Sequence, residues 1–134
     1  GVEACVKEKV WLKSGGSIII QPTEALTVID VNTEKAIKGK YSIQELFYKV
    51  NMEAAEEIAY QLRLRNITGI IMVDFIDMDD MNHRKSLLKT LEELVRPDPE
   101  KTTVVDMTAL NLVEMTRKKT RKPVLEQRRD IENI

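Results

Sequence analysis

The sequence predicts an α/β fold of the layered α+β kind, with a mixed sheet of about five or six strands and two main helices. Short runs rich in Ile, Val and Thr alternate with two longer segments whose apolar residues recur three and four positions apart. A strand, a helix and a strand succeed one another between residues 24 and 74, the pattern of a right-handed βαβ unit. The 134 residues, 43% apolar and 32% charged, suit one domain with its own core.

Three strands are expected before the first helix. Residues 2–13 end in alternating apolar and polar residues, and Ser14–Ser17 reads as a hairpin connection because its glycines can adopt positive φ. Ser17–Ile20 is the return strand. Pro22 is expected to break the ladder, since proline has no N–H to donate. A third strand is predicted over residues 24–30.

A long amphipathic helix is predicted over residues 42–65, after a polar loop at 34–41. Ser42 and Glu45 have the spacing of a capping box, in which each side chain accepts from the other residue's backbone N–H. The apolar residues form one stripe. They are Ile43, Leu46, Phe47, Val50, Ala54, Ile58 and Leu62. A strand at 69–74 follows the helix.

The second half of the chain predicts one more helix and two more strands. The helix covers about residues 79–95, and its acidic start suits the positive end of the helix dipole. Prolines just beyond it favour termination. A strand at 102–105 ends on Asp106, and the last strand is expected at 110–115.

The ends of the chain carry separate expectations. From Arg117 the sequence becomes basic and loses its periodicity, so residues 1–122 are predicted to form the domain and residues 123–134 a poorly ordered tail or linker. The chain begins with Gly1 rather than Met, which suggests a fragment of a longer protein. It contains no apolar run of 18 residues and no secretory signal, so we expect a cytoplasmic protein without a membrane span.

Two strands of the predicted βαβ unit each end on an aspartate, Asp30 and Asp74. Parallel strands share a carboxyl edge, where ligands of open α/β sheets bind. Two carboxylates without a nearby His or Cys suit Mg²⁺, which prefers oxygen ligands and can activate water beside a phosphoryl group. The structural alternatives are a turn before the next helix for Asp74 and an Asx turn with Asn32 for Asp30.

Other acidic residues have simpler interpretations. Asp77, Asp79 and Asp80 precede the second helix and are predicted to cap it. Asp106 could be a third ligand, although a turn role is preferred. The single cysteine, Cys5, excludes an internal disulfide and a thiolate zinc site built from this chain alone. The net charge of −1 provides no general basic field, so any nucleic-acid contact must come from a local patch.

Several stretches resemble the ribonuclease E/G family of bacterial and plastid endoribonucleases. The resemblance runs in order from residue 9 to about residue 122. It covers the family's deoxyribonuclease I-like subdomain, which carries the catalytic centre. The motifs are Ser14–Ile20 (SGGSIII), Thr23–Asn32 (TEALTVIDVN), Asn51–Ala55 (NMEAA), Gln61–Arg65 (QLRLR), Val73–Met78 (VDFIDM) and Leu112–Arg117 (LVEMTR).

The resemblance implies a function for the acidic pair. The family's "IDVN" and "DFIDM" aspartates bind the catalytic Mg²⁺, for which Mn²⁺ can substitute; here they are Asp30 and Asp74. It implies that Asn32 supports the metal site and that Lys101 approaches the scissile phosphate. The implied reaction is hydrolysis of single-stranded RNA by metal-activated water, leaving a 5′-phosphate and a 3′-hydroxyl.

The chain also departs from the family pattern. Thr68-Gly69 stands where the family usually has Gly-Gly, and Asn111 where it often has Gly. The S1 domain, the 5′-end sensor and the ribonuclease H-like region are expected elsewhere in the parent chain, as is the CxxC pair that shares zinc between subunits. We therefore expect no zinc here, a homo-oligomeric parent, and weak RNA binding with little or no cleavage by the isolated chain.

Two other functions remain open at this point. A non-catalytic RNA-binding or assembly module with the same fold would have no need of a paired acidic edge. A Mg²⁺-dependent phosphotransfer enzyme would form an acyl phosphate on Asp30 or Asp74, and the extended motif match argues against it.

Overall fold

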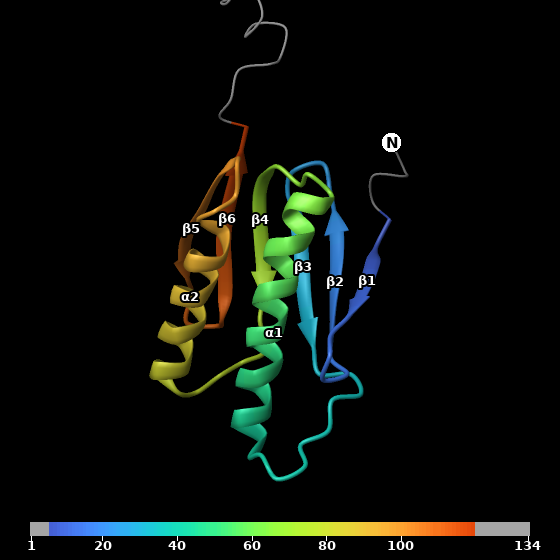
Figure 1. Cartoon of the computed structure of the whole chain (residues 1–134), viewed down its shortest axis with the longest axis vertical. Helices are drawn as coiled ribbons and strands as arrows, with labels where there is room; N and C mark the ends of the chain where they lie inside the picture. The colour runs from blue at the N-terminus through green and yellow to red at the C-terminus, as the bar shows by residue number, and fades with distance from the viewer. Residues whose placement is uncertain (1–5, 120–134) are drawn as a thin grey trace, which may run out of the picture.

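The computed structural model describes residues 6–119, which form one mixed sheet with two helices packed on one face (Figure 1). The strand order is β1-β2-β3-β4-β6-β5, and β3 and β4 are the parallel pair. The elements are β1 Glu8–Trp11, β2 Ser17–Pro22, β3 Thr27–Asn32, α1 Ile43–Leu64, β4 Gly69–Asp74, α2 Met81–Val95, β5 Lys101–Met107 and β6 Leu112–Lys118. The predicted α/β class is confirmed, as are the mixed sheet of about five or six strands and the two main helices.

The long helix α1 begins as its sequence predicts. The Ser42 side chain accepts from the Glu45 backbone N–H at 3.1 Å, and the Glu45 carboxylate accepts from the Ser42 N–H at 2.9 Å. Two of the N–H groups that a helix start leaves without partners are thereby satisfied. The connection from β3 through α1 to β4 is the predicted parallel βαβ unit.

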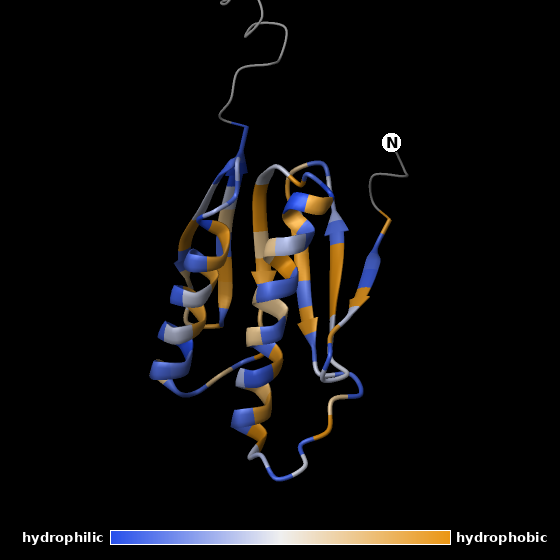
Figure 2. Ribbon diagram, in the orientation of Figure 1, coloured by the Kyte–Doolittle hydropathy of each residue, from blue (hydrophilic) through white to orange (hydrophobic). Residues whose placement is uncertain are grey.

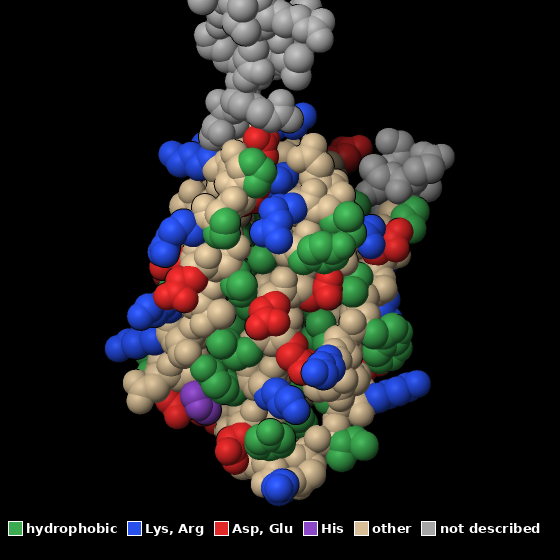
Figure 3. Space-filling view, viewed as in Figure 1, with side chains coloured by type: hydrophobic (Ala, Val, Ile, Leu, Met, Phe, Trp, Pro, Cys, Tyr) green, Lys and Arg blue, Asp and Glu red, His purple; other side chains and the backbone are tan. Residues whose placement is uncertain are grey.

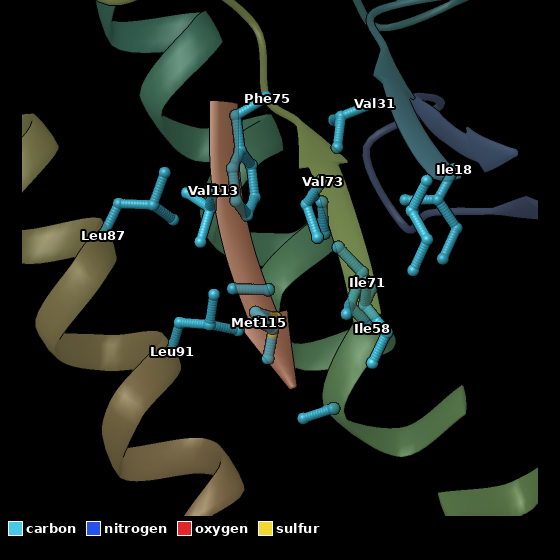
Figure 4. Close-up of a cluster of buried hydrophobic side chains, with 14 of the residues drawn as sticks. Ile18, Val31, Ile58, Ile71, Val73, Phe75, Leu87, Leu91, Val113 and Met115 are labelled. Atoms are coloured by element: carbon cyan, nitrogen blue, oxygen red, sulfur yellow. The ribbon is translucent and has the colours of Figure 1, made fainter. Parts of the chain in front are cut away.

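The core lies between the helices and the sheet. Leu87 and Leu91 of α2 point toward Val113 and Met115 of β6, and all four are fully buried (Figure 4). Full burial of each such side chain contributes about 1.5–3 kcal/mol. Along both helices hydrophobic and hydrophilic residues alternate, as expected of elements with one buried face (Figure 2).

Alternating burial along the strands identifies the two faces of the sheet. In β3, Thr27, Ile29 and Val31 are buried under the helices, whereas the residues between them are only partly buried. No helix of the described residues covers the opposite face. We call it the open face; the residues used below are Lys9, Trp11, Ser17, Ile19, Asp30, Asn32 and Asp74.

The β2–β3 hairpin differs from the prediction at Pro22. Strand β2 continues through this proline, which pairs with Thr27, so β3 begins three residues later than expected. Strand β1 starts at Glu8, opposite Ile20, and Pro22 therefore has a neighbouring strand on one side only. A proline in that position loses no ladder hydrogen bond on its open side.

The last strand also differs from the prediction. It covers Leu112–Lys118 rather than 110–115, so Arg117 and Lys118 are strand residues, although the sequence becomes basic and loses its periodicity from Arg117. Arg117 faces the helix side and is only 3% exposed. Its charge is tolerated because it pairs with Asp98. The predicted tail at 123–134 lies outside the described residues.

The surface over the helices carries no single-sign field, since Lys and Arg side chains are interspersed with Asp and Glu (Figure 3). None of the helices within residues 6–119 is long and apolar enough to cross a membrane.

Candidate functional site

The two predicted ligands meet on the open face. Asp30 of β3 lies directly opposite Asp74 of β4 in the parallel register. Side chains of paired residues point to the same side of a sheet. Asp30 is partly buried and Asp74 is exposed, whereas the preceding residue of each strand is fully buried. Both carboxylates are therefore accessible near the carboxyl ends of the parallel strands.

A cleft of about 340 Å³ surrounds this pair. Its walls come from the end of β3, from the acidic turn that follows β4, and from one aromatic residue of α1. The lining residues are Asp30, Val31, Asn32, Thr33, Phe47, Asp74, Phe75, Ile76 and Asp77. The space is large enough for a hydrated cation or a phosphate group.

The electrostatics of the cleft favour a cation. Partial burial raises the pKa of Asp74, and the negative charges of Asp30 and Asp77 raise it further. Within residues 6–119, none of these three carboxylates forms a salt bridge. A cation would relieve their mutual repulsion.

The ligand set suits a hard ion that keeps part of its hydration shell. In the described part of the chain no three His, Cys, Asp or Glu side chains are grouped for metal binding. Mg²⁺ is commonly held by one or two carboxylates, with water and substrate phosphate oxygens completing its octahedron. The Asp30–Asp74 pair fits this pattern.

The structure assigns different positions to the other candidate acids. Asp80 caps α2, accepting from the N–H of Asn82 at 2.7 Å, as predicted. Asp77 does not cap α2 and lines the cleft instead, so its prediction as a cap is wrong. Asp106 lies on β5 opposite Glu114, outside the cleft, and accepts from the N–H of Met107.

Asn51 of α1 holds the acidic turn in place. Its side chain is fully buried; Nδ2 donates to the Ile76 carbonyl at 2.9 Å, and the Ile76 N–H donates to Oδ1 at 3.0 Å. This two-point contact fixes the backbone between Asp74 and Asp77 against the helix. The sequence pattern of α1 did not predict this role of Asn51. The one sequence feature that points to it is the position of this polar residue, directly after Val50 and within the buried face of α1.

Asn111 supports the other side of the turn. Its carbonyl accepts from the Phe75 N–H at 3.2 Å, and its own φ is 62°. Glycine adopts this left-handed region freely, and asparagine tolerates it better than most residues. The conformation thus explains how Asn can stand where the family often has Gly.

Lys101 does not join the aspartates. It pairs with Lys118, whereas Asp74 pairs with Leu112 at the other end of β6. Six strand residues at about 3.4 Å each separate the two positions by roughly 20 Å. The structure therefore brings Asp30, Asp74 and Asn32 together and leaves Lys101 at the opposite end of the sheet.

Comparison with known proteins identifies the lineage of this acidic cleft. A sequence model of the ribonuclease E/G family matches residues 1–120. The chain belongs to the ribonuclease E/G family. It is 46% identical to ribonuclease G of Escherichia coli strain K12 over 123 residues, which are 92% of the chain and 25% of that relative.

Other members show comparable similarity. Ribonuclease G of Haemophilus influenzae is 46% identical over 120 residues, covering 90% of the chain and 24% of the relative. Ribonuclease E of Escherichia coli strain K12 is 42% identical over 118 residues, covering 88% of the chain and 11% of the relative. The chain thus spans about a quarter of the length of the curated ribonuclease G relatives that it matches.

Proposed function

We propose that this chain is the catalytic subdomain of a Mg²⁺-dependent endoribonuclease that hydrolyses single-stranded RNA. The observation that carries the proposal is the pairing of Asp30 with Asp74 across parallel strands, at an accessible cleft. Its support is membership of a family whose relatives are named ribonucleases. The products would be a 5′-phosphate and a 3′-hydroxyl.

The residues in and around the cleft would have different roles. Asp30 and Asp74 would hold Mg²⁺, or Mn²⁺ in its place. Such an ion, when bound, activates water and stabilises charge on a phosphate. Asn32 lies two residues beyond Asp30 on the same strand face and would orient groups around the site. Asn51 keeps the turn that carries Asp74 and Asp77 in position.

The partners belong to the same proposal. Phosphate contacts dominate nucleic-acid affinity, and a chain of net charge −1 offers few of them. Single-stranded RNA would therefore be held largely by S1 and ribonuclease H-like regions of a longer, homo-oligomeric and cytoplasmic parent. The chain alone would bind RNA weakly and cleave it slowly or not at all. Robust, EDTA-sensitive cleavage by the chain alone would contradict this part.

Mn²⁺ titration followed by paramagnetic broadening in NMR tests the metal site directly. We expect broadening centred on Asp30, Asn32 and Asp74, and its loss in Asp74→Asn. Asp106→Asn is the matched control, because it removes an acid from the same sheet outside the cleft. If broadening is not localised at the cleft even with a short RNA present, the metal assignment is wrong.

A further inference from the structure

Trp11 is a large aromatic side chain at the edge of the open face. It is the only tryptophan of the chain and is 50% exposed. Trp11 pairs with Ser17, which in turn pairs with Asn32. Lys9 likewise pairs with Ile19, which pairs with Asp30. The two β1 residues therefore stand in the same cross-strand rows as the cleft residues, two strands away.

Two lysines lie against the indole ring. The ammonium groups of Lys9 and Lys35 are 4.7 Å and 5.4 Å from the ring centroid. Lys9 is also paired with Glu34 at 2.9 Å, while Lys35 forms no salt bridge with any described residue. This basic aromatic patch is Lys9, Trp11 and Lys35.

The patch is connected to the cleft through the backbone. Lys35 belongs to the loop that leaves β3 directly after Asn32. Its N–H donates to the Gly15 carbonyl at 3.0 Å, which ties this loop to the β1–β2 hairpin. Lys38 and Lys40 extend the same loop and are exposed. Positive charge thus lies beside an acidic cleft in a chain without net positive charge.

This combination matches the chemistry of an unpaired nucleotide. A base has an aromatic face that stacks on Trp, and the adjoining phosphate pairs with ammonium groups. Two interstrand spacings of about 4.8 Å place the patch roughly 10 Å from Asn32. That separation is suited to nucleotides flanking a phosphate held in the cleft.

We propose that Trp11 stacks an unpaired base of single-stranded RNA while Lys35 and Lys9 contact the neighbouring phosphate. The proposal rests on the proposed function for the identity of its ligand, and adds a substrate-binding subsite to the acidic cleft. Stacking on one exposed ring selects unpaired bases and tolerates any base identity.

Intrinsic fluorescence tests the contact, because Trp11 is the sole tryptophan. The chain is titrated at low salt in EDTA with a short, non-self-complementary oligoribonucleotide. We expect saturable quenching by this RNA and none by the corresponding duplex, whose bases are already stacked. Absence of quenching by the single strand would overturn the proposal.

Variants separate stacking from general binding, measured by the anisotropy of labelled RNA. Trp11→Leu should weaken binding about tenfold, the loss expected for one stacked base, and Trp11→Phe should weaken it less. Tyr41→Leu is the matched control: this aromatic is 43% exposed and its ring centroid is 5.2 Å from the Lys49 ammonium, but it lines a different pocket, with Tyr48 and His83. Equal effects of Trp11→Leu and Tyr41→Leu would overturn the proposal.

The charge contribution has its own readout. Lys35→Gln should reduce the slope of log affinity against log salt by about 0.7, as expected for one lost phosphate contact on a single strand. An unchanged salt slope would show that Lys35 makes no phosphate contact and is not part of the subsite.

The proposals for the metal site and for the RNA subsite can be rejected independently of each other. The fluorescence titration is performed without metal, so it is independent of Asp30 and Asp74. Quenching without localised Mn²⁺ broadening would support the RNA contact and reject the nuclease assignment. Localised broadening without quenching would reject the RNA contact alone.

Discussion

Carboxylates at the two ends of the sheet have pKa values shifted in opposite directions. At the carboxyl end of β3 and β4, Asp30 and Asp74 face each other, and the pKa of Asp74 is raised. At the other end, Asp98 binds Arg117 through two hydrogen bonds of 2.8 Å and 3.1 Å. Hydrogen bonds and the Arg117 charge overcome the effect of burial there and lower the pKa of Asp98 to about 2.

The difference distinguishes a stabilising network from the proposed metal site within one domain. Arg117 also donates to Asn66 at 2.9 Å, and Asp98 accepts from Thr102 at 2.6 Å, so this end joins four segments in a satisfied network. The acidic end has no such neutralising partners in the described chain. A carboxylate pair left without counter-charges costs stability and retains its capacity to bind a cation.

Removal of Asp98 should have the largest effect. Asp98→Ala leaves the Arg117 guanidinium buried without its partner, which should lower the free energy of unfolding by about 3–5 kcal/mol. Urea denaturation measures this loss. Glu8→Ala is the control, since it breaks the solvent-exposed Arg65–Glu8 pair at 3.8 Å and should cost at most about 1 kcal/mol. Similar losses in both variants would contradict the contrast between buried and exposed pairs.

Asn51→Ala should be next in size, at about 2 kcal/mol, because the buried Ile76 backbone groups lose both partners. The variant should also weaken Mn²⁺ binding, since the turn carrying Asp74 is no longer held. Urea denaturation and Mn²⁺ broadening measure the two effects.

Asn66→Gly provides the comparison for Asn51→Ala. It removes one contact of Arg117 at the stable end, and glycine accepts the φ of 50° found there. We expect a loss of stability with unchanged Mn²⁺ binding. If Asn51→Ala behaves in the same way, Asn51 contributes only to stability.

Acid titration should show opposite shifts at the two ends. The folded pKa of Asp98 lies below its usual value of 3.8, so its contribution to stability is complete above pH 3.8 and is lost as pH falls toward 2. The loss amounts to about 2 kcal/mol. Carboxyl ¹³C NMR should find Asp98 titrating near pH 2 and Asp74 above 3.8. The reverse order would refute the comparison.

Asp74→Asn should give the smallest change in stability, with the opposite sign. Because the folded pKa of Asp74 is raised, its ionised form opposes folding at neutral pH. A neutral amide should therefore stabilise the fold by about a few tenths of a kcal/mol, given solvent screening of an exposed group. Thermal unfolding at pH 7 without metal measures it, and a lowered Tm would show that Asp74 contributes favourable contacts instead.

Local pattern and chain handedness were sufficient to predict the acidic pair. The stripe of α1, its Ser42 cap and the two flanking strands are local features, and a βαβ unit has one favoured hand. These features are enough to place Asp30 and Asp74 at one edge of the sheet without any knowledge of side-chain contacts. The family resemblance added the chemistry implied for them.

Which charged residues lie at which end of the sheet could be read only from the three-dimensional structure. Arg117 resembled a tail residue in sequence, Asp77 a helix cap, and Lys101 a phosphate ligand by resemblance. Their positions depend on strand register and on partners distant in sequence: Asp98 for Arg117, and Asn51 for the turn carrying Asp77. Because periodicity is local, the sequence was sufficient to predict which elements form and where the acidic pair lies. Pairing between distant segments set the bounds of β3 and β6 and the partners of the other charged residues.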